Sequence, residues 1–237
     1  TPRGMAFSAD GTKMFVVGDT GDDVNEYALT TAFDVSTSSF TDSFYINAQD
    51  PLPNDVAFNT DGTKMFVLGK NSDTVYAYTL TTGFDVSTAS YSSVSFSVTA
   101  QDTQPAGMAF NTDGTKMFIV GYAGQDINEY ALTTGFDIST ASFTDSFSVA
   151  SQETEPYGVA FNSNGTKMFV VGNNVDTVFQ YTLTTGFDVS TASYDSISYS
   201  VASQDNTVVD VEFNPTGDKM FIVGLQNDSI YEYTIPL

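Results

Sequence analysis

The chain has 237 residues with a formal net charge of −22, from 29 acidic and 7 basic residues, and it contains no histidine and no cysteine. These absences exclude a disulfide framework, a thiolate nucleophile and a Cys-based zinc site, so any catalysis must use carboxylates, tyrosines or a hard metal. The negative charge repels nucleic acid and anionic lipid, and no apolar run reaches the roughly 18 to 20 residues of a bilayer span, so we expect no nucleic-acid partner and no membrane insertion.

One short motif recurs along the whole chain. Gly-Thr-Lys-Met-Phe, or Gly-Asp-Lys-Met-Phe in the last copy, appears five times, and its lysine recurs at spacings of 51, 52, 51 and 52 residues. The repeated lysines are Lys13, Lys64, Lys116, Lys167 and Lys219. We expect them to have a structural role, in which each cation neutralises nearby acidic segments while its stem covers apolar surface.

Each repeat predicts four short strands in chain order. The first strand is Gly-Met-Ala-Phe in the first copy, and an Asp-Gly or Asn-Gly turn follows it in four of the five copies, as a tight hairpin requires. The second strand, Lys-Met-Phe-Val-Val-Gly, is apolar at consecutive positions, and the third alternates. A connection of the type Thr-Thr-Gly-Phe-Asp-Val-Ser-Thr-Ala-Ser precedes the fourth strand. The phenylalanine of this connection is expected to anchor it to the strands of the same repeat.

Four-stranded units repeated about every 50 residues are typical of a β-propeller, in which each blade packs against its neighbours. We predict an all-β, five-bladed propeller in one domain, residues 1–237, with an open β-solenoid and a β-sandwich as alternatives. The predicted blades are approximately residues 1–52, 53–104, 105–155, 156–207 and 208–237. Odd and even units differ by one residue, which a bulge in the fourth strand would absorb.

The fifth unit contains only three of the four strand patterns. We therefore expect the last blade to lack its outer strand within this chain. The chain begins at Thr1 without a methionine, so we also expect a trimmed or processed protein. The completing strand would have been removed upstream or would come from another molecule, and self-association through the incomplete fifth blade is one form of this.

The motif Pro-x-Gly-[Met/Val]-Ala-Phe-x-x-[Asp/Asn]-Gly-Thr-Lys-Met-Phe-[Val/Ile]-Val-Gly, followed by a Val-x-x-Tyr third strand, resembles YVTN and NHL β-propeller repeats. It is especially similar to the tandem repeats with DGTKM and FDVSTAS elements in marine phage structural proteins and bacterial surface proteins. The resemblance implies an extracellular, cell-surface or virion-associated protein. It covers nearly the whole chain and is specific for the fold and not for a function, because such families include lactonases, lyases, lectin-like modules and scaffolds. The repeat spacing of 51 to 52 residues is longer than that of WD-type blades, which argues against carrying over any catalytic residue.

The loops between the second and third strands and the links between blades vary most among the copies, and binding residues are common on such loops. Their acidic side chains are expected either to close turns or to bind a partner. The candidate binding residues are Asp22, Asp23, Asp73, Asp126, Asp176 and Asp228. Calcium, which takes six to eight oxygen ligands, is a possible ion here, although no contiguous calcium-loop motif is present. The candidate metal ligands are Asp50, Asp102, Glu153 and Asp205.

The entrances of the first strands also differ among the blades, and they are expected to rim the central channel. The residues concerned are Arg3, Asn54, Asp55, Tyr157 and Asp210. The arginine and the aspartates would form either a structural ion pair or a polar site for a sugar or hydroxy acid.

From these features we expect a non-catalytic binding or assembly module that presents variable acidic loops to a glycan or protein partner, and we expect no enzyme activity. Two alternatives remain open. One is a metal-dependent, lactonase- or lyase-type propeller enzyme with its site at the central channel, and the other is a calcium-stabilised scaffold.

Overall fold

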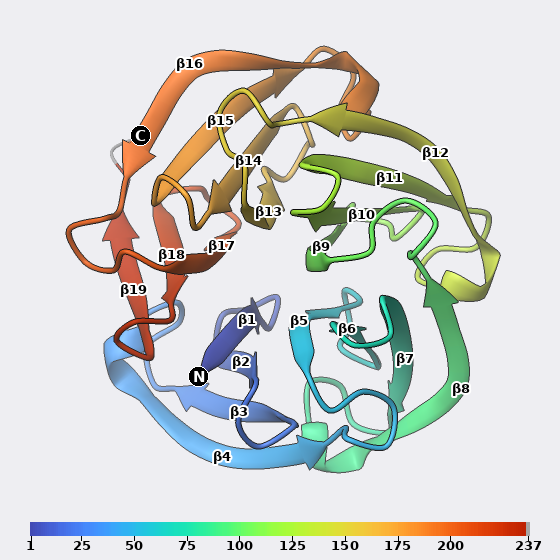
Figure 1. Cartoon of the computed structure of the whole chain (residues 1–237). Helices are drawn as coiled ribbons and strands as arrows, with labels where there is room; N and C mark the ends of the chain where they lie inside the picture. Colours follow the sequence, from blue (N-terminus) through green and yellow to red (C-terminus); the bar gives the residue numbers. More distant parts are fainter. Residues whose placement is uncertain (236–237) are drawn as a thin grey trace.

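The computed structural model describes residues 1–235 as a ring of five β-sheets around a central axis (Figure 1). Blade 1 consists of β1 (Pro2–Phe7), β2 (Lys13–Gly18), β3 (Asp23–Leu29) and β4 (Ser38–Tyr45). Blade 2 consists of β5 (Pro53–Phe58), β6 (Lys64–Gly69), β7 (Thr74–Leu80) and β8 (Ala89–Ser97). Blade 3 consists of β9 (Pro105–Phe110), β10 (Lys116–Gly121), β11 (Asp126–Leu132) and β12 (Ala141–Ser148).

Blade 4 consists of β13 (Pro156–Phe161), β14 (Lys167–Gly172), β15 (Thr177–Leu183) and β16 (Ala192–Ser200). Blade 5 has three strands, β17 (Val208–Phe213), β18 (Lys219–Gly224) and β19 (Ser229–Thr234). The predicted five-bladed propeller with a three-stranded last blade is therefore confirmed, and the solenoid and sandwich alternatives are wrong. Within residues 1–235, no helix has the length and apolar character of a membrane-spanning segment.

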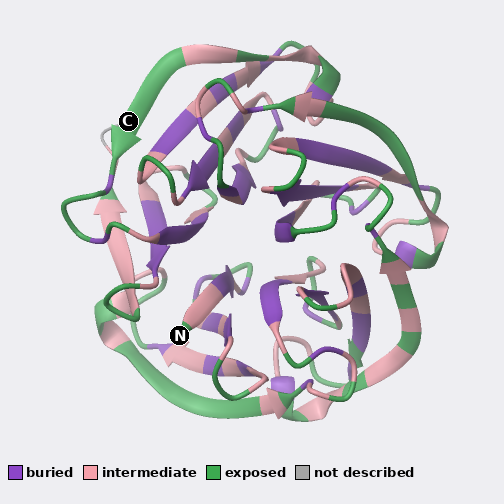
Figure 2. Ribbon diagram, viewed as in Figure 1, coloured by how far each residue is buried: buried purple, intermediate pink, exposed green. Residues whose placement is uncertain are grey.

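The hydrophobic core lies between neighbouring blades. Phe15 and Val17 of blade 1 pack with Met65 and Tyr78 of blade 2, and the same arrangement recurs around the ring. Figure 2 shows that burial concentrates on the inner strands, while the outer strands are largely exposed. Each sheet thus hides its apolar faces against the next sheet, which explains why the repeats need one another.

The connection between the third and fourth strands is anchored as the sequence predicts. In blade 2, the ring of Phe84 lies over Gly62 of the first hairpin turn, where an added Cβ would come within 2.3 Å of the ring. Gly62 also has a φ of 71°, so the turn needs glycine for both its conformation and its space. Asp85 then caps the 3-10 turn η2 (Val86–Thr88) through Ser87.

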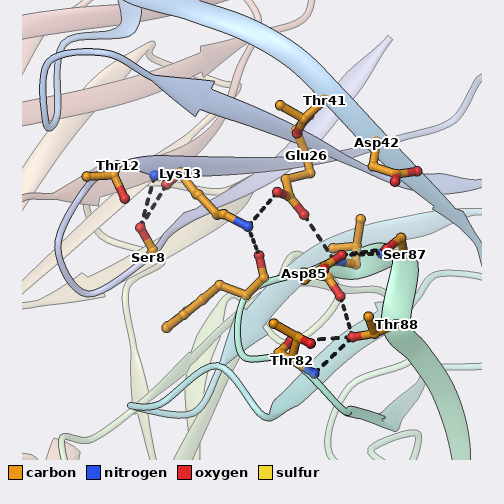
Figure 3. A network of polar contacts seen from close by, with 12 residues as sticks. Ser8, Thr12, Lys13, Glu26, Thr41, Asp42, Thr82, Asp85, Ser87 and Thr88 are labelled. Carbon is orange, nitrogen blue, oxygen red and sulfur yellow. Dashed lines mark hydrogen bonds and ion pairs between the residues drawn. The ribbon is translucent and has the colours of Figure 1, made fainter.

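The repeated lysine joins one blade to the next (Figure 3). Nζ of Lys13 donates to the carbonyl oxygen of Phe84 at 2.6 Å and lies 2.7 Å from Oε1 of Glu26. Oε2 of the same glutamate accepts a hydrogen bond from the backbone N–H of Val86 at 3.0 Å. The lysine has the structural role expected of it, and its carboxylate partner extends that role across the blade boundary.

Equivalent contacts close the ring. Lys219 of blade 5 donates to the carbonyl oxygen of Phe33 in blade 1 at 2.6 Å, and Glu232 accepts from the N–H of Val35 at 3.1 Å. Phe221 of blade 5 belongs to one apolar cluster with Met5 of blade 1. The last blade therefore meets the first through the same polar and apolar contacts that join the other blades.

The one-residue difference between odd and even repeats lies in the fourth strand. In blade 1, the paired residues pass from Glu26 with Asp42 to Tyr27 with Phe40, which leaves one residue unpaired. In blade 2, two residues are unpaired between Val94 and Tyr91, and Ser93 takes a positive φ of 62°. The predicted bulge is confirmed.

Replacing Phe118 by alanine should lower the free energy of unfolding by about 3 to 5 kcal/mol, because its ring is fully buried against Phe161 and Phe187 of the next blade. Urea denaturation measures this. The matched control, Phe40→Ala, removes a ring that is 58% exposed and should cost less than about 1 kcal/mol. Equal losses in the two variants would contradict interblade packing as the main source of stability.

Candidate functional site

The third residue of each inner strand stands where neighbouring blades approach most closely. Three blades have glycine there, and an added Cβ on Gly158 would lie 2.8 Å from Cα of Asp210 in the next blade. The other two blades have Asp55 and Asp210 at this position. A longer side chain fits only where it extends across to the following blade.

Both aspartates make such an interblade contact. Oδ2 of Asp55 accepts from the N–H of Met108 in blade 3 at 2.6 Å, and Oδ2 of Asp210 accepts from the N–H of Met5 in blade 1 at 2.8 Å. Their second oxygens accept from the N–H of the next residue in their own strands. Asp55 is 4% exposed and Asp210 is 5% exposed, so both acids are buried and their carboxyl groups are bonded to backbone N–H groups.

A third carboxyl group, that of Glu212, stands two residues after Asp210 on the same face of β17. The four other blades place a small apolar residue here: Ala6, Ala57, Ala109 and Ala160. Glu212 and these alanines line one cavity of about 320 Å³. The cavity opens among the turns that join first to second strands, where Thr60, Thr112 and Ser163 lie.

The environment raises the pKa of all three carboxyl groups. Glu212 is partly buried at the cavity, where loss of hydration raises its pKa to about 8, and the charge of Asp210 adds to the effect. Burial raises the pKa of Asp210 to about 7, while its hydrogen bonds from Met5 and Val211 oppose the rise. Burial raises the pKa of Asp55 as well, and the nearby Asp210 raises it further. At neutral pH this cluster retains protons that exposed carboxyl groups would release.

Glu212 was missed in the sequence analysis, which considered the strand entrances and the varied loops. The signal that would have revealed it is the alignment of the five first strands, because one glutamate stands in a column of four alanines. Of the three carboxyl groups in the cluster, this is the one that lines the cavity.

The remaining predicted rim residues lie apart from this cluster. Nε of Arg3 donates to Asp19 at 2.8 Å, so the arginine forms an ion pair, but its partner is Asp19 and neither of the predicted rim aspartates. Asn54 is buried and donates to the carbonyl oxygen of Pro105 at 2.7 Å. Tyr157 stacks on Tyr122 with ring centres 5.3 Å apart. Asp55 and Asp210 are the predicted rim residues that share the carboxyl cluster.

The predicted loop aspartates serve local turns. Asp22, Asp73, Asp176 and Asp228 adopt φ values of 48 to 54°, the left-handed region that aspartate tolerates better than most residues. The carbonyl oxygen of Asp22 accepts from the N–H of Ile46 at 2.9 Å, which ties the end of the fourth strand to the loop. The other two candidates form side-chain bonds instead: Oδ1 of Asp23 accepts from the amide of Asn25, and Oδ1 of Asp126 accepts from the amide of Asn128.

The four metal candidates are buried carboxylates that bind backbone N–H groups. Asp50 accepts from the N–H groups of Leu52 and Ser72, each at 2.9 Å, and so joins the interblade link to the loop between second and third strands. The equivalent acids make the same type of contact: Asp102 with Gln104 and Gly124, Glu153 with Glu155 and Asn174, and Asp205 with Thr207 and Asn227. In residues 1–235, no group of three or more acidic side chains is arranged to hold a metal ion.

Comparison with solved structures supports the fold. The chain is similar to a "putative 6-phosphogluconolactonase" from Bacteroides uniformis, at 14% identity and a TM-score of 0.58 over 98% of this chain and 67% of that chain. It is also similar to a functionally unknown protein from Desulfotomaculum acetoxidans, at 14% identity and a TM-score of 0.60 over 99% and 69%. A third neighbour is the periplasmic gluconolactonase of Pseudomonas aeruginosa, at 12% identity and a TM-score of 0.55 over 99% and 66%.

At these identities the likeness shows the fold alone, and the chain spans about two thirds of the length of these neighbours. No family model and no curated protein matches the chain, so the resemblance to YVTN, NHL and phage repeats stays a prediction. The expectation of a non-catalytic binding module without enzyme activity is corrected by these neighbours. Their names favour the lactonase alternative.

Replacing Glu212 by glutamine should change how stability depends on pH. The folded protein retains a proton on Glu212 up to about pH 8, whereas the unfolded chain releases it near pH 4.5, so the free energy of unfolding falls as pH rises between these values. Glu212→Gln lacks this loss and should gain stability relative to the parent protein between pH 4 and pH 8, as measured by urea denaturation. The exposed control Glu155→Gln should follow the parent curve, and parallel curves for all three proteins would contradict the raised pKa.

Proposed function

We propose that the protein is a metal-independent hydrolase of a small lactone, with Glu212 as its acid–base residue at the central cavity. The observation that carries this proposal is a carboxyl group with a pKa of about 8 that lines a cavity where four equivalent blades have alanine. A catalytic acid or base works best when its pKa lies near the operating pH. The lactonase names among the structural neighbours add support at the level of the fold.

The chemistry needs one carboxyl group that first accepts and then returns a proton. The ionised Glu212 takes a proton from water as the water oxygen attacks the lactone carbonyl carbon. The ring C–O bond then breaks, and Glu212 returns the proton to the leaving ring oxygen, which becomes the hydroxyl of a hydroxy acid. Asp55 and Asp210 do not line the cavity. The charge of Asp210 adds to the loss of hydration that raises the pKa of Glu212, so Asp210 acts on the site through Glu212.

The charge around the cavity favours an uncharged substrate. The chain carries a net charge of −22, and the cavity is lined mostly by apolar side chains, with a few neutral polar side chains and one acidic residue, Glu212. A phosphate group would be repelled there. Asn59, Asn111 and Asn162 line the cavity, and each donates to a threonine hydroxyl and accepts from a lysine backbone N–H in its own hairpin turn. The second amide N–H of each asparagine is left for a hydroxyl group of a sugar lactone or a similar small ring.

The other expectations from the sequence remain proposals. The strongly acidic composition supports an extracellular, cell-surface or virion-associated setting rich in cations, where salt screens self-repulsion. Calcium as a stabilising ion, and a glycan or protein partner at the varied loops, also stay predictions.

Glu212→Gln should lower kcat/KM for a neutral lactone by at least about 100-fold, because it removes the proton acceptor while keeping the side-chain volume. A pH-indicator assay of gluconolactone opening, corrected for spontaneous hydrolysis, measures this. In the parent protein, kcat/KM should rise with pH up to about pH 8, since the ionised carboxylate is the active form.

Glu155→Gln is the matched control and should retain the parent rate, because this glutamate is exposed and outside the cavity lining. Addition of a chelator should leave the rate unchanged. An equal rate in Glu212→Gln and the parent protein, or no lactone opening above the spontaneous rate for a panel of neutral lactones, would rule out the proposal.

A further inference from the structure

Blade 5 leaves an apolar groove between itself and blade 4. The groove has a volume of about 730 Å³, and Phe169 and Val178 of blade 4 face Phe213, Met220 and Tyr233 of blade 5 across it. In residues 1–235, β19 pairs only with β18, so its outer edge carries unpaired backbone groups. The groove is thus bordered by an open strand edge as well as by apolar side chains.

The other blades show what fills the equivalent space. A phenylalanine ring from the connection covers the glycine of the first hairpin turn in each: Phe33 on Gly11, Phe84 on Gly62, Phe136 on Gly114 and Phe187 on Gly165. At Gly217, the corresponding glycine of blade 5, no described atom lies within 4 Å of the place where a Cβ would stand. The position of the anchoring ring is open in blade 5.

The contacts of the repeated lysines also show that an anchoring phenylalanine is missing from blade 5. Four lysines donate to the carbonyl oxygen of the anchoring phenylalanine in the following blade: Lys13 to Phe84, Lys64 to Phe136, Lys116 to Phe187 and Lys219 to Phe33. Lys167 of blade 4 instead donates to Thr182 at 2.6 Å and Asp195 at 2.8 Å within its own blade. A backbone carbonyl oxygen at the position of the anchoring phenylalanine in blade 5 would give Lys167 the acceptor that the other four lysines have.

The outer strand of blade 4 also lacks its usual neighbour. Strands β4, β8 and β12 each contact the 3-10 turn of the following blade: η2 (Val86–Thr88), η3 (Ile138–Thr140) and η4 (Val189–Thr191). In blade 2, Val94 and Phe96 are partly buried against the core shared with blade 3. Their counterparts on β16, Ile197 and Tyr199, are 54% and 55% exposed.

We propose that this groove binds a segment of the repeat's own connection type, Gly-Phe-Asp-[Val/Ile]-Ser-Thr followed by an alternating strand, from outside residues 1–237. All four copies of the connection within this chain are already bound in their own blades. The occupant places a phenylalanine ring over Gly217, offers its carbonyl oxygen to Lys167 and adds a fourth strand to the edge of β19. The groove thus continues the interface that already joins the other blades.

A synthetic peptide with the sequence of residues 184–200 tests this inference, because it contains the connection and the outer strand of blade 4. Isothermal titration calorimetry on the whole chain should show binding at a one-to-one ratio. The same peptide with Phe187→Ala should bind at least about tenfold more weakly, since it lacks the anchoring ring. In the protein, Ile197→Asp should weaken peptide binding similarly, whereas Phe40→Asp, which changes an exposed ring on β4, should not.

Three results would overturn the inference. The first is no binding of the peptide at about 1 mM. The second is equal binding of a scrambled peptide, which would indicate a nonspecific apolar surface. The third is a dimer of the chain alone that Ile197→Asp dissociates and the peptide does not, because the groove would then be an interface between two copies. These readouts are independent of lactone hydrolysis, so the docking inference and the proposed activity can fail separately.

Discussion

The close approach of the five inner strands around the axis is the constraint on which the rest of the structure depends. The third position of these strands has room for glycine or for a side chain that bonds to the following blade, as Asp55 does with Met108. Two carboxyl groups are thereby buried beside Glu212. Loss of hydration makes ionisation of each carboxyl group costly, which raises the pKa of Asp210 to about 7 and that of Glu212 to about 8. The raised pKa values of the cluster therefore follow from the burial of carboxyl groups between the inner strands.

Near-identical blades act as internal controls for one another. Where four blades share a residue or a contact and the fifth has another, the shared fold does not require the departure. Glu212 in a column of alanines and Lys167 without a partner carbonyl in blade 5 are two such departures. The first marks a cavity with a titratable group, and the second marks an interface that lacks its usual segment. The cavity and the groove share Phe161, Asn162 and Ser163 in their linings, but the two proposals rest on separate departures.

The fold could be predicted from the sequence because the same pattern of strands and turns recurs five times. The blade count, the three-stranded last blade, the bulge and the anchoring phenylalanines all follow from periodicity and turn residues. Asp55 and Asp210 were identified, but Glu212 was not, because its importance comes from a cavity formed by residues far apart in the chain. The functional expectation was wrong because the absence of histidine was taken to disfavour an enzyme, although burial can tune carboxyl groups for acid–base work.

Carboxyl-carbon NMR of protein labelled selectively at glutamate tests the central claim most directly. The chain has six glutamates, and the Glu212→Gln variant assigns the signal of Glu212. The account predicts that this signal titrates near pH 8. A midpoint near the ordinary glutamate value of 4.5 would show that Glu212 is fully hydrated, and the acid–base site would then have no physical basis.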